Sequence, residues 1–331
     1  MLFRSTRASL AQPRSDAAIT AAAGKLAEAE LALAQARAGE LAKVQALLQP
    51  ISGAQAAAAL GRGGGGGRGG ALTPDNYDGF TALFDGKTLN GWDGDPMFWS
   101  VKNGVLHAES TPEKVVGQNI PGNTFLIWKG GTVKDFELKV DYRFLASGTD
   151  NTPVASGNSG VQFRSRMSGP QNGAERPWGI SGYQMDMVAQ GGTGSGVFYT
   201  EGGGFGLTQQ GTAMRASDNP AGGAAVMKQI GSLGTGVVDS VKPSPEWNTY
   251  HIIAVGNSIM AFLNGRLAVT LVDDNRSGPQ YALEGLLALQ MHAGAPFAVE
   301  FRNLYLKPIK AENLTPTPAP AGAGRGGRGG Q

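Results

Sequence analysis

The chain has 331 residues, enough for one large or two ordinary domains, with a formal net charge of +2 and only 16% charged residues. It contains no cysteine, which excludes disulfides, thiolate metal sites and cysteine nucleophiles. The near-neutral charge, and the lack of a long basic stripe interleaved with aromatic residues, argue against a dedicated nucleic-acid-binding domain.

Residues 1–60 are predicted to be a helical extension. Leucine and alanine recur at helical spacing from about Asp16 to Gln49, and Pro50 ends the run. The apolar stripe is narrow, which suits either a helix that docks on a partner or self-associates, or a marginal helix that buries little. The first fifteen residues lack the apolar core of a signal peptide, and no run reaches the roughly 20 apolar residues of a membrane-spanning helix. We therefore expect no membrane span.

Two glycine-rich segments flank the next region. Residues 61–72 contain GRGGGGGRGG, a composition typical of a flexible linker. Residues 311–331 are rich in proline, glycine and arginine, and we expect a disordered tail. Arg-Gly tracts can bind RNA, but two short tracts are a weak signal for it.

Residues 73–310 have the pattern of an all-β domain. Short alternating runs are separated by turn residues, and no long helical pattern interrupts them. Asn264-Gly265, between two apolar runs, predicts a hairpin. We expect a jelly-roll sandwich of two antiparallel sheets. The main predicted strands fall in residues 136–144, 161–166, 183–188, 249–255, 260–272, 286–292 and 298–307.

Two of these runs place polar side chains on one face of a strand. In NSGVQFRSR, the side chains of Gln162 and Arg164 alternate with apolar ones, and in SGYQMD the polar residues are Gln184 and Asp186. Two such strands could form a polar floor. Asp186 is the single carboxylate of its run, so the paired carboxylates of an ordinary sandwich glycosidase are missing there.

Further candidates lie on other runs. His292 follows Gln290 by two residues and precedes a glycine, so we expect both side chains on one face at a strand end, where an imidazole could act as a base or ligand. Tyr199 and Glu201 share a face at the start of a glycine-rich loop. Trp128 suits either a sugar-stacking platform or packing against the core. Structural roles are as good or better explanations for His107, His251, Trp247 and the Glu300–Arg302 pair.

A series of segments in order along the chain resembles the 3-keto-disaccharide hydrolase domain family, formerly domain of unknown function 1080. The resemblance covers about residues 79–307. It rests on GFTALFDGKTLNGWDG, FWSVKNGVLHAES, GNTFLIWKGG, VKDFELKVDYRF, GNSGVQFRSR, SGYQMD, EWNTYHIIAVGNSIMAFLNG, GLLALQMHAG and FRNLYLK.

The resemblance implies a concanavalin-like jelly-roll that acts on glycosides already oxidised to a ketone at C3. A C3 ketone acidifies the C2 proton, so a base can remove it and the C1 substituent leaves by β-elimination, after which hydration completes a net hydrolysis. Metal-assisted members are expected in such a family, so a divalent metal ion could polarise the ketone. Relatives of this kind also suggest a periplasmic or secreted location.

The resemblance also assigns expected roles to residues of this chain. His292, Asp186 and Glu201 are the expected catalytic residues, and Asp186 and His292 are the expected metal ligands. Relatives often carry an arginine directly after the glutamate of the tyrosine loop, where this chain has Gly202–Gly204. The alternative hypothesis is a non-catalytic carbohydrate-binding module that uses the same face. The expected substrate-binding residues are Asn158, Arg164, Gln184, Tyr199, Trp128 and Gln290.

Overall fold

The computed structural model describes residues 77, 79–118, 122–170, 173–206, 208–234 and 236–310. The predicted helical extension (1–60), linker (61–72) and tail (311–331) lie outside these residues. Apart from two single 3-10 turns, Gly192–Gly194 and Val238–Ser240, the described residues form only strands, turns and loops. None of the described segments is a helix long and apolar enough to cross a bilayer.

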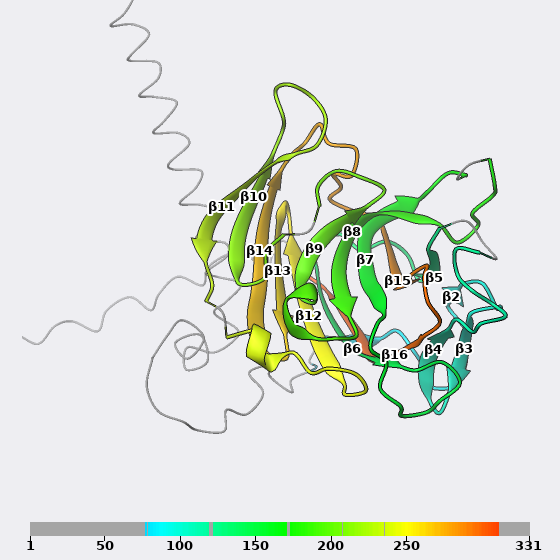
Figure 1. The fold of residues 1–331 in the computed structure, drawn as a ribbon. Helices are drawn as coiled ribbons and strands as arrows, with labels where there is room; N and C mark the ends of the chain where they lie inside the picture. Colours follow the sequence, from blue (N-terminus) through cyan, green and yellow to red (C-terminus); the bar gives the residue numbers. More distant parts are fainter. Residues whose placement is uncertain are drawn as a thin grey trace, which may run out of the picture. The chain divides into compact units, whose positions relative to one another are not determined.

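The strands form two sheets (Figure 1). In spatial order the larger sheet contains β11 (Val226–Ser232), β10 (Thr212–Ser217), β14 (Arg266–Asp274), β13 (Ser258–Leu263), β12 (Asn248–Val255), β6 (Phe136–Leu145), β16 (Ala298–Pro308), β4 (Val105–Glu109) and β3 (Trp99–Lys102), with β1 (Thr81–Ala82) paired to β16. The smaller sheet contains β2 (Trp92–Asp93), β5 (Thr124–Trp128), β15 (Leu286–Met291), β7 (Asn158–Met167), β8 (Ile180–Val188) and β9 (Val197–Glu201).

The all-β sandwich predicted from the sequence is confirmed, with one correction to the pairing. Strands β10 and β14 run parallel, so the larger sheet is mixed rather than wholly antiparallel. Antiparallel neighbours can be joined by a hairpin, whereas a parallel pair needs a longer crossover, and here β11 to β13 lie between the two strands in sequence. The predicted hairpin at Asn264-Gly265 joins β13 to β14, and both turn residues have positive φ, as a tight hairpin turn requires.

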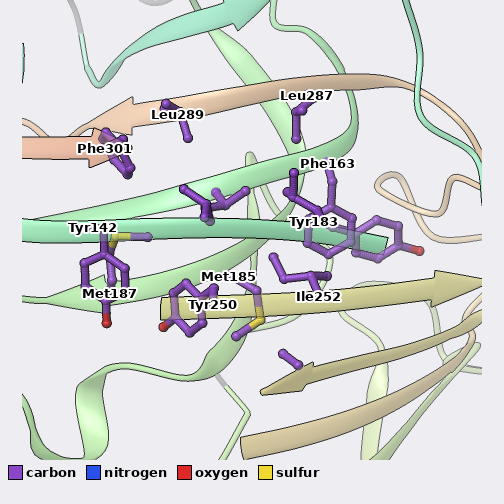
Figure 2. Packing of buried hydrophobic residues seen from close by; sticks show 14 of the residues in the cluster. Tyr142, Phe163, Tyr183, Met185, Met187, Tyr250, Ile252, Leu287, Leu289 and Phe301 are labelled. Atoms are coloured by element: carbon purple, nitrogen blue, oxygen red, sulfur yellow. The ribbon is translucent and has the colours of Figure 1, made fainter. Parts of the chain in front are cut away.

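One large hydrophobic core includes side chains from both sheets. Tyr183, Met185 and Met187 of β8 belong to it, and Figure 2 shows them among core side chains that include Tyr250 and Ile252 of β12. Because side chains alternate along a strand, the residues between them project from the opposite face of the smaller sheet. Because one face of β8 packs in the core, the polar residues of β8 lie on the opposite face of the sheet.

Candidate functional site

A cleft of about 190 Å³ lies on the face of the smaller sheet that is turned away from the core. Side chains from β7, β8, β9 and the ends of β5 and β15 border it, although they come from segments up to 169 residues apart (123 to 292). The lining residues are Asn123, Asn158, Gln184, Asp186, Tyr199, Glu201 and His292.

Strand register explains why these residues meet. Gln184 lies opposite Tyr199 on β9, and Gly182 lies opposite Glu201, so the three side chains share one face of the sheet. Gly160 of β7 lies opposite Asp186. A Cβ atom at Gly160 would lie 2.4 Å from the side-chain carbonyl carbon of Gln184, so only glycine leaves room for that amide. The arrangement of the site therefore depends on antiparallel strand pairing and on the absence of a side chain at Gly160.

Buried amides form the floor of the cleft. The amide of Gln162 donates to Oε1 of Gln184, and Nε2 of Gln184 donates to Oδ1 of Asp186 at 2.7 Å. Nε2 of Gln290 donates to Gln184 at 3.0 Å and to Glu201 at 3.2 Å. Gln162 and Gln290 are fully buried and Gln184 nearly so. Because each amide is held by its neighbours, both carboxyl groups are fixed in orientation before any ligand binds.

Of the two carboxyl groups that line the cleft, that of Asp186 has the more strongly shifted pKa. Burial raises the pKa of its carboxyl to about 7, against the opposing effect of hydrogen bonds from Gln184 and, at 3.4 Å, from Asn158. The nearby charge of Glu201 raises it further. A carboxyl whose pKa lies near neutrality can both accept and return a proton at that pH, as a general base must.

Glu201 supplies a second carboxyl to the same cleft. Its Oε1 accepts from Nδ2 of Asn123 at 3.2 Å, while its other oxygen faces Gln290. Burial raises the pKa of Glu201, and the positive charges of His292 and Arg176 partly counteract that effect.

His292 is fixed by one ring nitrogen. Its Nδ1 lies 2.5 Å from the carbonyl oxygen of Ala293, and only a protonated nitrogen can donate to a carbonyl. Nε2 is consequently the nitrogen left to exchange a proton with a ligand. The adjacent backbone is also held, because the amide of Ala293 donates to Oδ1 of Asn123 at 2.9 Å.

Tyr199 places a phenol at the half-exposed edge of the cleft. Burial raises the pKa of the phenol, and the charges of Glu201 and Asp186 act in the same direction. The hydroxyl therefore keeps its proton at neutral pH and is available as a hydrogen-bond donor to a ligand.

The sequence profile of the 3-keto-alpha-glucoside-1,2-lyase-like domain matches residues 79–307, most of the chain. The chain belongs to this family. The resemblance expected from the sequence motifs is thereby confirmed over the range expected for it. A search of curated proteins found no significant match.

Solved structures similar to the 3-keto-glucoside lyase-like domain are distant. A candidate glycosyl hydrolase from Parabacteroides distasonis is 18% identical, with a TM-score of 0.42, and the match covers 70% of this chain and 95% of the other. A carbohydrate-binding module from Bacillus subtilis is 14% identical (TM-score 0.37; 66% and 95% covered). A β-glucanase from Bacillus licheniformis is 13% identical (TM-score 0.34; 74% and 100% covered). Scores at this level carry no argument about function.

Arg164 lies outside the cleft of this family member, contrary to expectation. The register between β7 and β8 shifts between Phe163 and Arg166, and Arg164 has a φ of 48°, so the simple alternation of the strand is broken. The guanidinium is buried and donates to the carbonyls of Lys134 and Gly256 and, at 3.2 Å, to Asp135. The Arg164 guanidinium therefore links two loops and does not line the cleft.

Trp128 also lies away from the cleft. It is partly buried against the main core and lies over Gly130, where a Cβ atom would meet the indole at 2.1 Å. Of its two proposed roles, packing is the one that the structure supports. His107 and His251 lie on the larger sheet and pair with Glu300 and Glu137, each at 3.1 Å, as structural histidines do.

Three residues near the cleft were missed by sequence reasoning. Asn123 immediately precedes β5, and Arg176 and Trp178 lie in the loop before β8. Sequence position alone gave little signal, because a proline- and glycine-rich loop can project in many directions. Only a count of every polar or aromatic residue that flanks a cleft strand would have included them.

The cleft does not provide a ready set of metal ligands. Asp186, Glu201 and His292 all border it, but among the described residues no three histidine, aspartate or glutamate side chains converge closely enough to hold a metal ion. The Oδ1 atom of Asp186 and both oxygens of Glu201 are engaged by amide donors. The expected Asp186–His292 metal pair stays a prediction, and no step below is routed through a metal.

Proposed function

We propose that this protein cleaves 3-keto-glycosides by removing the C2 proton, eliminating the C1 substituent and hydrating the product. The observation that carries the proposal is the cleft itself. It holds a buried carboxyl with a pKa near 7 together with a histidine whose Nε2 is available, over a fixed amide floor. Membership of the 3-keto-glucoside lyase-like family supports the substrate class.

In the first step the carboxylate of Asp186 accepts the proton from C2. The electron pair of the C–H bond moves into a C2–C3 double bond, and the C3 oxygen gains negative charge as an enolate. Tyr199 suits the role of donor to that oxygen, because the raised pKa of its phenol keeps the proton in place. Hydrogen-bond donors fixed before reaction stabilise such charge most effectively.

In the second step the C3 carbonyl re-forms, the C1–O bond breaks, and the electron pair becomes a C1–C2 double bond. The leaving oxygen needs a proton, which the imidazolium of His292 supplies from Nε2. The carboxyl of Asp186 then exchanges its proton with solvent. Water adds at C1 and gives its spare proton to Nε2 of His292, while Asp186 delivers a proton to C2, which completes a net hydrolysis and restores both groups.

A pair of carboxyl groups in one cleft is also what an ordinary glycosidase needs for catalysis. Asp186 and Glu201 satisfy that count, so hydrolysis of an unoxidised glycoside is the second candidate function. The two mechanisms differ in what the substrate must supply. Elimination needs a C3 ketone, whereas direct displacement at C1 does not.

The deciding assay compares a 3-keto-glucoside with its unoxidised parent, with and without a chelator. We expect release of the C1 substituent from the keto compound alone, and a strongly reduced kcat/KM in the Asp186→Asn variant. Cleavage of the parent would instead support the ordinary glycosidase. Release from neither, together with measurable sugar binding, would leave a non-catalytic carbohydrate-binding module. Loss of activity with chelator, restored by added metal, would contradict the metal-free assignment of the steps.

A further inference from the structure

A second cavity, of about 110 Å³, adjoins the cleft at Asn123, which lines both. The loop before β8 and the start of β5 form its walls. No step of the proposed reaction uses it. Its lining residues are Asn123, Thr124, Glu175, Arg176, Pro177, Trp178 and Gly179.

Trp178 is held rigidly beside this cavity. Its indole N–H donates to Oδ1 of Asp93 on β2 at 2.8 Å. The ring packs against a small hydrophobic cluster, separate from the main core, whose buried members are Phe125, Ile127, Ile180 and Ala288. Ala288 lies opposite Gln162 in the sheet, so the cluster shares the face that carries the cleft. On this face of the sheet, the buried amides of the cleft are therefore followed by an apolar cluster, and the indole of Trp178 packs against that cluster.

Arg176 adds one directional polar group. Its Nη2 donates to the backbone carbonyl of Asn123 at 3.0 Å, which holds the guanidinium beside the cavity. Its Nε is buried and has no hydrogen-bond partner among the residues that the structure describes. The side chain as a whole is only partly buried, so its remaining N–H groups can donate to an acceptor on a ligand in the cavity.

We propose that this cavity is a second subsite of the cleft and holds the group attached to C1 as an aromatic ring, which stacks on Trp178 and presents an acceptor atom to Arg176. The assignment rests on the proposed function. Asn123 connects the two spaces, because its Oδ1 holds the backbone beside His292, the proposed acid of the leaving group. A group that leaves past His292 therefore enters this cavity.

The walls favour an aromatic ring over a second sugar. The surface that lines the cavity is mainly apolar, although four polar residues border it. A sugar with several hydroxyls would therefore lose more water contacts than it regains, whereas an aromatic ring brings few polar atoms. Stacking on an indole is also strongest for a flat ring. The volume is on the scale of the roughly 150 Å³ cavity that accepts benzene.

The test measures kcat/KM for both anomers of p-nitrophenyl 3-keto-glucoside, for methyl 3-keto-glucoside and for a 3-keto-disaccharide. In Trp178→Ala the ratio of the aryl to the methyl value should fall about 10- to 100-fold, as expected for a lost stacking contact of roughly 1–3 kcal/mol. Trp178→Phe should restore most of it. Trp247→Ala is the matched control, because Trp247 is also partly exposed but lies between Arg143 and Arg302, both on strands of the larger sheet.

A binding measurement separates this subsite from the chemistry. Saturation-transfer NMR with unoxidised p-nitrophenyl glucoside should show transfer to the ring protons in the parent protein and its loss in Trp178→Ala. If no keto-glucoside is cleaved but this transfer depends on Trp178, the proposed function fails and the subsite stands. An unchanged aryl-to-methyl ratio in folded Trp178→Ala would overturn the subsite. Stronger dependence on Trp178 for the disaccharide than for the aryl substrate would overturn its aromatic assignment.

Discussion

Asp186 lies where a carboxylate is poorly solvated, and its side-chain hydrogen bonds come from the neutral amides of Gln184 and Asn158. Neutral donors stabilise the ionised form less than a cation would, so burial dominates and the pKa rises to about 7. Amides at these two positions therefore leave the pKa of Asp186 near neutrality. An arginine at either position would lower that pKa, and the carboxyl would stay ionised at neutral pH.

Loss of the Asp186 carboxylate should remove most of the catalysis. We expect Asp186→Asn to lower kcat/KM for a 3-keto-glucoside by about 10²- to 10⁴-fold, the usual contribution of a positioned base. The ionised form is the active one, so wild-type kcat/KM should rise with pH through a midpoint near 7. The control is Asp150→Asn, a change in an exposed carboxylate that pairs with Lys102. A flat profile between about pH 5 and pH 8 would contradict the assignment.

The same carboxyl should affect stability in a pH-dependent way. Its pKa is raised from 3.8 to about 7 on folding, so between these values the folded state binds more protons than the unfolded state, and stability falls as pH rises. Asp186→Asn lacks this effect. We therefore expect the free energy of unfolding of the variant, relative to wild type, to increase by a few kcal/mol from about pH 4 to pH 8. Urea unfolding measures it, and a constant difference would argue against the buried, raised carboxyl.

At the scale of elements, β8 is the strand that sequence analysis interpreted best. Its period-two pattern placed Met185 in the core and Gln184 and Asp186 on the opposite face, as observed. The adjacent strand β7 kept that pattern only as far as Phe163. The register shift after this residue turned Arg164 toward the loops, and a bulge leaves no periodic signal in a sequence. Alternation therefore predicts a face only where pairing is regular.

The Gly160→Ala variant tests whether the absence of a side chain at this position of β7 sets the position of Gln184 in the floor of the cleft. In Gly160→Ala the new methyl group would overlap the amide of Gln184, which must move away from Asp186. We expect kcat/KM to fall about 10- to 100-fold through misplacement of the base, with KM changing less. Gly169→Ala is the matched control, since a Cβ atom there meets nothing within 4 Å. Equal activity of the two variants would show that the absence of a side chain at Gly160 has no functional role.

Arg164 is expected to matter for stability and not for substrate binding. Arg164→Met removes hydrogen bonds to two loop carbonyls and the pairing with Asp135, and should lower the free energy of unfolding by about 3 kcal/mol. KM measured well below the melting temperature should stay near the wild-type value. Arg166→Met, an exposed change on the same strand, is the control. A large increase in KM without loss of stability would restore Arg164 to the binding site.

At the scale of the whole molecule, pairing of β9 with β8 changes the chemical interpretation of the sequence. The run that contains Asp186 carries a single carboxylate, but antiparallel pairing brings Glu201 to the same cleft. Sequence spacing could place Tyr199 and Glu201 on one face of a strand. It could not show which strand they would join, because β pairing is set by contacts distant in the sequence.

The sandwich could be predicted because its strands carry local signals, whereas the cleft depends on loops that do not. Trp128 and Trp178 illustrate the difference. The first lies in a strand and packs against the core, while the second lies in an irregular loop and borders the second cavity. Aromatic character alone did not distinguish them. Hydrogen bonding to Asp93 fixes the position of Trp178, and that contact spans 85 residues of sequence.

The most direct test of the central claim follows the hydrogen at C2 when the reaction is run in D2O. Elimination and hydration break the C2–H bond and form it again through the carboxyl of Asp186, whose proton exchanges with D2O while the C1 substituent leaves, so the 3-keto-glucose released at early times should carry deuterium at C2 by NMR. Free 3-keto-glucose incubated with and without the protein under the same conditions controls for exchange after release. Product that retains protium at C2 while the C1 substituent is released would contradict elimination and support direct displacement at C1.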